Sequence, residues 1–243
     1  MSVIFAVIWG AVSAFALVVV VGHALRAGRK LAEVRGTPTS PIARAPSSGR
    51  VEIAGKVVPG PEGAAPSPVL GVDAVTWWTQ ISEDLGSARK ILATLERDAD
   101  FFVDDGSGAL ARVSPRSAKV MLRPQRTGGP EAEARAHALA VAAKPDIDPK
   151  RVFFSETVLA PGDAVYALGE ASLDSGGPVP AAYRDRPSRI LVVTAPAGGE
   201  LLLGDDERAV AAQLAVRRTI LWCAPAGLVV VGAFPAIAAA LGH

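Results

Sequence analysis

Two long segments of the chain carry no charged side chain, one near each end. They cover residues 3–22 and 219–241, and most of their positions are apolar. A helix rises about 1.5 Å per residue, so about 20 apolar residues are enough to cross the hydrocarbon layer of a bilayer. The pattern therefore predicts two transmembrane helices and the fold class of a membrane protein. A cleavable signal peptide is the alternative for the first segment, but it needs a basic start that Met1-Ser2 does not supply.

The residues beside these segments predict an orientation. Arg and Lys follow the first segment and precede the second, whereas the outermost residues at both ends carry neither. Flanks on the cytoplasmic side of a membrane hold the excess of Lys and Arg. Together with the Ala-, Gly- and Arg-rich composition, this pattern predicts an integral protein of a bacterial inner membrane. We expect a cytoplasmic central domain, both termini outside, and the lipid bilayer as a partner.

Between the two segments the pattern changes along the chain. Residues 23–49 are predicted as a juxtamembrane segment and linker, because 37–49 is rich in Pro, Ser and Thr. Residues 50–204 are predicted as a β-rich domain. A juxtamembrane helix is predicted over 205–218, with Asp205 as its cap.

Short strands dominate the predicted central domain, and one helix interrupts them. Alternating apolar positions and β-branched or aromatic residues indicate the strands. The predicted strands cover 51–58, 74–82, 101–103, 109–113, 164–169, 189–194 and 201–203. Gly55 interrupts the first strand as a bulge would. An alanine-rich helix is predicted over 131–143, ended by Pro145. These elements predict a small antiparallel OB-like barrel or sandwich with an inserted helix.

Composition and charge narrow the chemistry that the chain can perform. The 25 Lys and Arg residues nearly balance the 24 Asp and Glu residues, which argues against a nucleic-acid-binding surface. The single cysteine, Cys223, excludes an intrachain disulfide. Three histidines and one cysteine do not make a zinc set, so we predict no metal site. No Gly-rich phosphate loop is present, and we predict no cofactor.

No catalytic residue is predicted, although three features resemble catalytic groups. Ser107 lies between glycines, as some nucleophiles do, but Asp-Gly at this place also supplies a hairpin turn. The hypothesis of a hydrolase that uses Ser107 stays open if His137 lies near Ser107 in space. The acidic pairs 104–105 and 205–206 have the composition of acid/base dyads. We favour a turn for the first pair and a helix N-terminus for the second, where negative charge is stabilised.

Two adjacent tryptophans, Trp77 and Trp78, form the candidate interaction surface. Neighbouring side chains on a strand point to opposite faces, so we expect one ring in the core and the other facing outward or covering an edge. A tryptophan that faces outward can anchor a protein partner.

Taken in chain order, several segments resemble the GIDE domain, also called BAM (beside a membrane). This family includes the region between the two spans of the mitochondrial RING-type ubiquitin ligase MULAN. The resemblance rests on residues 51–57, 67–68, 77–78, 101–108 and 156–170. The family-motif residues in these segments are Gly55, Asp104, Gly108, Gly162, Gly169 and Glu170.

The resemblance also implies a function. In the ligases, ubiquitin transfer depends on a RING finger that follows the second span and needs eight Cys and His ligands. This chain ends at His243 with one cysteine, so we expect no RING finger. The sequence therefore predicts a membrane-anchored GIDE-type interaction or scaffold module without catalytic activity, bound to an unidentified membrane or cytoplasmic protein. The alternative is a non-RING subunit or homologue of a membrane ubiquitin-protein transferase.

Overall fold

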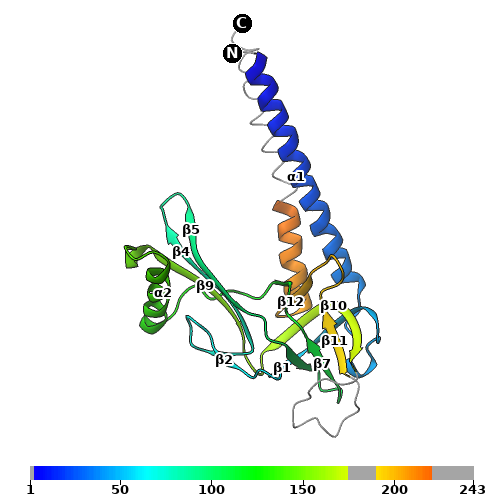
Figure 1. Ribbon diagram of the computed structural model, residues 1–243. Coiled ribbons are helices and arrows are strands. Elements are labelled where there is room, and N and C mark those ends of the chain that lie inside the picture. Colours follow the sequence, from blue (N-terminus) through cyan, green and yellow to red (C-terminus); the bar gives the residue numbers. More distant parts are fainter. Residues whose placement is uncertain (1–2, 175–189, 221–243) are drawn as a thin grey trace. The chain divides into compact units, whose positions relative to one another are not determined.

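The computed structural model describes residues 3–174 and 190–220. The chain divides into two compact units. One consists of residues Thr37–Asp206. Helix α1 (Val3–Gly36) and a helix over residues 207–220 belong to the other. Both helices and the strands of the larger unit are drawn in Figure 1.

The prediction of a membrane protein with two spans is contradicted by the part of the chain that the structure describes. Within residues 3–174 and 190–220, no helix is both long enough and apolar enough to cross a membrane. A span needs about 20 consecutive, predominantly apolar residues. The helix that contains the first predicted segment also takes in charged residues toward its end: Arg26, Arg29, Lys30, Glu33 and Arg35. Most of the second predicted segment, 221–241, lies outside the described residues.

Other predictions depended on these spans and are corrected with them. They are the fold class of a two-span membrane protein, the location in a bacterial inner membrane, and the orientation with both termini outside. The described chain is instead mostly β, with a five-stranded barrel and three α-helices within its described part.

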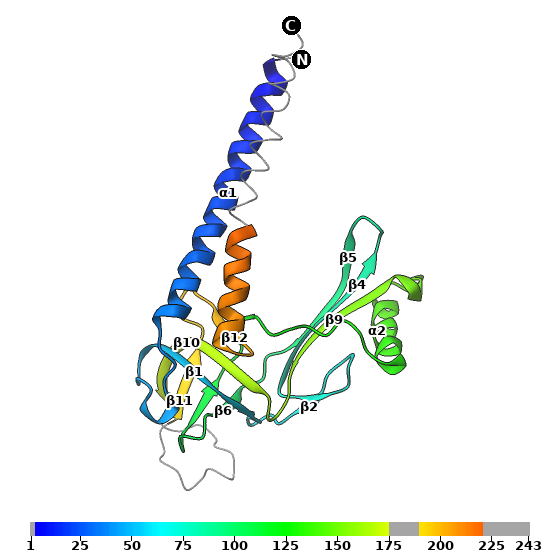
Figure 2. The same cartoon turned by 180° about the vertical axis from the view of Figure 1, so that it is seen from behind.

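Five strands of the unit Thr37–Asp206 form a closed barrel (Figure 2). Around the barrel the strands are β1 (Gly49–Val58), β6 (Phe101–Asp104), β7 (Leu110–Val113), β11 (Ile190–Thr194) and β10 (Ala164–Asp174). The ring closes because β10 also pairs with β1, from Gly49 opposite Ala171 to Lys56 opposite Ala164. Neighbouring strands are antiparallel except for β7 and β11, which run parallel.

Apolar side chains from all five strands fill the barrel. Alternate residues of a strand point to the same face, so each strand contributes every second side chain to the interior. The interior residues include Ile53, Val57, Phe101, Val103, Ala111, Val113, Val165, Ala167, Leu191 and Val193. Burying one large apolar side chain contributes about 1.5–3 kcal/mol, so this cluster is the main source of stability in the barrel.

Two glycines allow the barrel strands to approach closely. A Cβ atom at Gly55 would lie 2.5 Å from the carbonyl oxygen of Asp104 on β6. A Cβ atom at Gly169 would lie 2.5 Å from the carbonyl oxygen of Thr194 on β11. The predicted bulge at Gly55 is wrong, because the register of β1 with β10 runs without a shift. The glycine is needed for the close contact between backbones.

Two further strands extend the barrel sheet beyond β10. Strand β12 (Leu201–Gly204) pairs antiparallel with β10, and β8 (Ala118–Val120) pairs parallel with β12.

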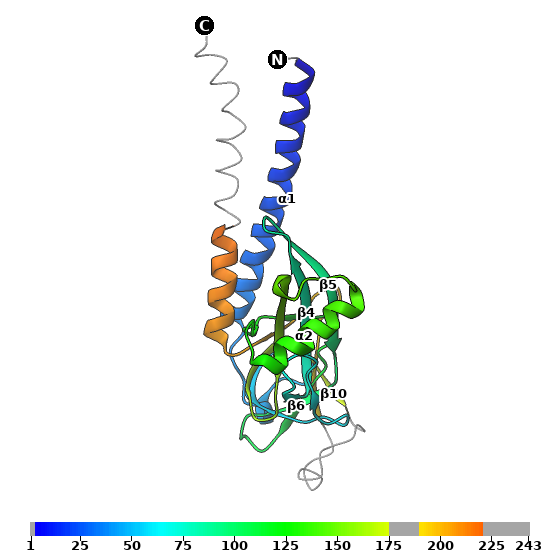
Figure 3. The ribbon, with the colours of Figure 1, turned by 90° about the vertical axis from the view of Figure 1, so that its left-hand side faces the viewer.

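A separate three-stranded antiparallel sheet has the order β5 (Arg89–Arg97), β4 (Thr76–Asp84), β9 (Val152–Leu159). Helix α2 (Pro130–Ala143) covers one face of this sheet, as Figures 1 and 3 show. The predicted helix over 131–143 is confirmed. Its buried residues Ala132, Ala136 and Ala140 pack with Ile81 and Phe154 of the sheet. Two short strands that precede β4 in the chain, β2 (Ala65–Pro66) and β3 (Asp73–Ala74), pair antiparallel with each other.

Candidate functional site

The face of the three-stranded sheet opposite α2 carries exposed apolar side chains. Residues paired across antiparallel strands point to the same face, and the next row points to the other. Ile81 and Phe154 pair in register and pack under α2. The next row, Ser82 with Ile91 and Phe153, therefore points away from α2. Of these side chains, Ile91 is 57% exposed and Phe153 is 36% exposed.

A cation and several polar groups surround this apolar pair. The guanidinium of Arg89 lies 4.5 Å from the centroid of the Phe153 ring, a cation–π contact that contributes about 0.5–1 kcal/mol at an exposed site. The neighbouring row on the same face contains Gln80, Thr94 and Ser155. We call this surface the open face; it consists of Gln80, Arg89, Ile91, Thr94, Phe153 and Ser155. Aromatic residues and arginine are enriched at protein interfaces.

The two tryptophans predicted as an interaction surface lie at the other end of β4. Trp78 packs against the core of the barrel. Trp77 is half-buried, with the guanidinium of Arg97 5.4 Å from its ring centroid. Arg97 in turn donates a hydrogen bond of 3.0 Å to the carbonyl oxygen of Ala74. Each ring thus has a structural contact within the chain, and binding of a partner by either stays a prediction.

A fully buried carboxylate, that of Glu156 on β9, holds the loop that precedes β4. Its two oxygens accept hydrogen bonds from the Ser67 hydroxyl (2.9 Å), the Val69 N–H (3.0 Å), the Leu70 N–H (2.7 Å) and the Thr79 hydroxyl (2.6 Å). Hydrogen bonds to a charged group contribute about 1.5–3 kcal/mol each. The side chain therefore positions the loop against the sheet.

Helix α2 holds the same loop from the other side. The Arg135 guanidinium donates to the carbonyl oxygens of Val69 (2.6 Å) and Leu70 (3.0 Å). Glu156 was not predicted as a functional residue; it entered the sequence-based predictions only within the segment 156–170. Its signal is a carboxylate on the inward face of a strand, in line with Phe154, where a charge needs hydrogen-bond partners.

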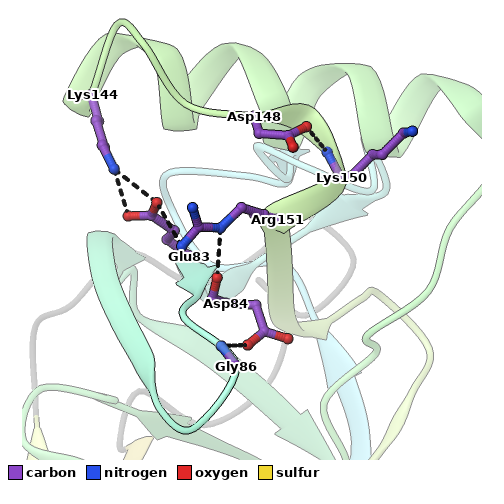
Figure 4. A network of polar contacts seen from close by, with 7 residues as sticks. All are labelled: Glu83, Asp84, Gly86, Lys144, Asp148, Lys150 and Arg151. Atoms are coloured by element: carbon purple, nitrogen blue, oxygen red, sulfur yellow. Dashed lines mark hydrogen bonds and ion pairs between the residues drawn. The ribbon is translucent and has the colours of Figure 1, made fainter.

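A second carboxylate, that of Glu83, joins the end of α2 to the sheet (Figure 4). The Lys144 ammonium donates to both of its oxygens, at 2.7 and 2.9 Å, and an Arg151 nitrogen lies 3.5 Å away. The Glu83 side chain is only 3% exposed. The hydrogen bond from Lys144 holds the pKa of Glu83 below its ordinary value. Burial opposes this effect, and the positive charges of Lys144 and Arg151 reinforce it.

The same network fixes the short 3-10 helix η2 (Pro149–Arg151), which precedes β9. Arg151 donates from Nε to the carbonyl oxygen of Asp84 at 2.8 Å, as Figure 4 shows. Asp148 accepts the backbone N–H of Lys150 at 2.9 Å and so caps η2. These contacts set the position of the first residues of β9.

A groove of about 330 Å³ lies where α2, η2 and β9 meet. Its lining combines cationic, polar and apolar groups. The lining residues are Arg126, Thr127, Glu133, Ala136, Pro149, Lys150, Val152, Phe153 and Phe154. Phe153 belongs both to this groove and to the open face, so the two surfaces are continuous.

Comparison with known proteins gives no family for the chain. No protein-family model, no curated protein and no solved structure matches it. The resemblance to the GIDE domain therefore stays a prediction, and the six family-motif residues are considered by their places in the structure.

Three of the family-motif residues lie together on the barrel. Gly55, Asp104 and Gly162 line an open hollow of about 530 Å³, together with Lys56 and Asp105. The rest of its lining comes mostly from β1, with Ala54, Val57 and Val58, and from Gly106 of the turn after β6. Its walls hold the barrel together: the Gly162 N–H donates to the Val57 carbonyl oxygen at 2.8 Å.

The other three family-motif residues lie elsewhere in the barrel. Gly108 belongs to the turn between β6 and β7. Gly169 and Glu170 lie on β10, opposite Val51 and Arg50 of β1, and Glu170 is exposed. The structure thus brings three of the six residues together and separates the rest.

The turn that contains Ser107 contacts the 3-10 helix η1 (Ile42–Arg44). The Ser107 hydroxyl accepts the N–H of Ala43 at 3.1 Å, and the Asp105 carboxylate accepts the N–H of Ile42 at 2.6 Å. Burial acts to raise the pKa of Asp105, but the hydrogen bonds from Ser107 and Ile42 outweigh it and leave the pKa below its ordinary value. The turn therefore holds η1 in place.

The remaining candidate groups also have structural places. His137 lies on α2, which packs on the three-stranded sheet, whereas Ser107 contacts η1 beside the barrel. Asp104 accepts the N–H of Gly106 at 2.8 Å, within the same turn as Ser107. The pair 205–206 directly precedes the helix over 207–220. In the described parts of the chain, no group of three or more His, Cys, Asp or Glu side chains is placed to hold a metal ion.

Proposed function

We propose that this chain is a non-enzymatic interaction module that binds a partner protein through the open face of the three-stranded sheet. The observation that carries the proposal is the exposed pair Ile91 and Phe153, with Arg89 over the Phe153 ring. Exposed apolar side chains that form a patch mark interaction sites more often than scattered ones do. A buried aromatic or arginine anchor then contributes most of the binding energy.

The placement of the carboxylates supports an interaction role rather than an enzymatic one. Glu156 accepts four hydrogen bonds from its own chain, and Glu83 is paired with Lys144 and Arg151. Asp105 accepts two backbone N–H groups. These groups make the scaffold rigid, and a rigid scaffold lowers the entropic cost of binding a partner.

The resemblance to the GIDE domain supports the same proposal, because it implies a scaffold or interaction module. The alternative drawn from that resemblance, a non-RING subunit of a ubiquitin-protein transferase, is a special case with a defined partner. Identification of the bound protein separates the two: a RING-bearing partner at the open face would support the special case.

Site-specific cross-linking tests the proposal. A photoreactive amino acid replaces Thr94 on the open face, and a matched variant carries it at Ala134, an exposed position of α2 outside the groove. We expect one dominant protein adduct in the native host from position 94 and none from position 134. Ile91→Asp in the position-94 variant should abolish the adduct, because a carboxylate replaces the apolar contact. Equal adducts from both positions, or no adduct from position 94 of the folded protein, would contradict the proposal.

A further inference from the structure

Strand β9 lies at the edge of the three-stranded sheet, and its own chain uses only part of that edge. Glu156 donates its N–H to the carbonyl oxygen of Gln125 (2.9 Å) and accepts the Gln125 N–H (2.7 Å), as an antiparallel partner would. After Gln125 the chain leaves the edge and leads into α2, which begins at Pro130. The segment around Gln125 thus pairs with the edge of β9 at Glu156 and then turns away from it.

The pleat of β9 shows which backbone groups continue this edge. Peptide groups two residues apart on a strand point to the same side, so Phe154 and Val152 point outward as Glu156 does. The intervening residues point toward β4: the Leu159 carbonyl oxygen accepts the N–H of Val75 at 2.9 Å, on the β4 side.

The outward backbone groups are those of Val152, which is half-buried, and Phe154, which is 7% exposed. The Val152 N–H donates to the carbonyl oxygen of Pro149. The N–H and C=O of Phe154 and the C=O of Val152 have no hydrogen-bond partner within residues 3–174 and 190–220. An exposed row of such groups is a template for an added strand. Unpaired backbone groups beside a groove favour a segment that satisfies them.

The charges of the groove indicate which segment fits. Arg126 and Lys150 line it, both are exposed, and neither forms an ion pair with another described residue. Glu133 is the one acidic residue among the lining residues. Complementary charge favours the correct partner and speeds its encounter.

We infer that the edge of β9 binds a short, extended, acidic segment of a partner protein, which adds to the sheet as a fourth strand beside Phe154. Backbone hydrogen bonds to Phe154 and Val152 would supply affinity, and contacts with Arg126 and Lys150 would supply preference for acidic side chains. This inference rests on the proposed function, since a partner on this edge also reaches Phe153 of the open face.

A synthetic peptide tests the inference on the full chain. The probe is a seven-residue peptide with blocked ends that alternates Asp or Glu with Val or Thr. Two control peptides carry an N-methyl group on the central backbone nitrogen, or Lys in place of every acidic residue. Amide hydrogen exchange of Phe154, compared with Phe153 and Ser155, reports pairing at the edge. Fluorescence titration gives the dissociation constant.

In the free protein the Phe154 amide should exchange faster than its two neighbours, which pair with β4. Saturation with the acidic peptide should slow it at least about tenfold, because a new hydrogen bond protects it. The N-methyl and Lys peptides should bind at least about tenfold more weakly. Arg126→Glu and Lys150→Glu should weaken the acidic peptide, whereas Arg44→Glu, the same charge change on η1, should not.

Several results would overturn the inference. The first is binding of the acidic peptide without protection of the Phe154 amide. The second is equally tight binding of the N-methyl peptide. The third is that neither of these two peptides binds at millimolar concentration. Protection of Phe154 in the free protein together with dimers in sedimentation would show that a second copy occupies the edge. A partner cross-linked at Thr94 without peptide binding would remove the edge inference and leave the proposed function standing. Failure of both experiments removes both.

Discussion

The barrel and the three-stranded sheet are built from the same kind of strand pairing, yet they leave different surfaces. In the barrel, β10 pairs with β1 and closes the ring, so each of the five strands is paired on both sides and their apolar side chains point inward. The three-stranded sheet has two edge strands, and α2 covers only one of its faces. Closure removes edges, whereas an open sheet exposes backbone groups and one row of side chains.

The two regions also share a device. Each has one fully buried glutamate that anchors a preceding segment. In the barrel, Glu52 accepts hydrogen bonds from the Tyr166 hydroxyl (2.7 Å) and from Thr39, which precedes β1. In the sheet, Glu156 accepts donors from the loop that precedes β4. The regions therefore differ in what they expose and resemble each other in how they are tied together. Stability should depend on the barrel core and these anchors, and binding on the open sheet.

The largest expected effect on the free energy of unfolding comes from replacing an interior residue of the barrel, compared with an exposed residue of the three-stranded sheet. Phe101→Ala empties part of the barrel interior, where Phe101 is fully buried, and should lower the free energy of unfolding by about 3–5 kcal/mol. Ile91→Ala, on the open face, should change it by less than about 0.5 kcal/mol. Urea unfolding followed by circular dichroism measures both. Similar losses for the two variants would show that the open face is buried in the free protein.

A smaller effect is expected from the buried anchor of the open sheet. Glu156→Ala leaves four hydrogen-bond donors without an acceptor and should cost about 3 kcal/mol, since an unsatisfied buried group costs about 1–3 kcal/mol. The matched control is Glu170→Ala, an exposed glutamate on β10 and one of the family-motif residues. It should change stability by less than about 0.5 kcal/mol. Unfolding in urea again gives the numbers, and the reverse order would refute the structural assignment of Glu156.

The same contrast explains what the sequence allowed us to predict. The barrel strands β1, β6, β7, β10 and β11 overlap the segments predicted as strands, because their alternating or β-branched residues form a local signal. The outer strands of the open sheet, β5 and β9, were not predicted. In β5, Ile91, Leu92 and Leu95 are spaced as on a helix among good helix formers. Pairing with β4 imposes the strand, and that information is not local.

The membrane spans and the candidate site also show that a local sequence pattern does not determine tertiary structure. Residues 3–22 were predicted as a span from their length and their uncharged, apolar composition, and the structure places them in a longer helix that continues to Gly36. The groove joins Arg126, Lys150 and Phe154, which lie on different elements, so only the tertiary fold brings them together. The burial of Glu156 could have been predicted from the sequence, because its carboxylate lies at an inward position of a strand rich in aromatic and β-branched residues.

The smallest expected effect concerns the ion pair at the end of the open sheet, and it depends on pH. The pKa of Glu83 is lowered in the folded chain, chiefly by the hydrogen bond from Lys144. A lowered folded pKa stabilises the fold at pH values above the ordinary carboxyl pKa of 4.5, and this contribution is lost as the pH falls through the lowered value. Glu83→Gln should therefore be less stable than the natural chain at pH 7.

Comparing the two chains across pH isolates this one group. Their free energies of unfolding should converge as the pH falls below 4.5, because the protonated Glu83 side chain is then neutral in both. Asp98 has a raised pKa from burial and from the charge of Glu96, but it is present in both chains and cancels in the difference. Lys144→Met, which removes the partner, should show the same convergence. A difference that stays constant from pH 7 to pH 3 would mean that Glu83 joins α2 to the sheet by its shape and not by its charge.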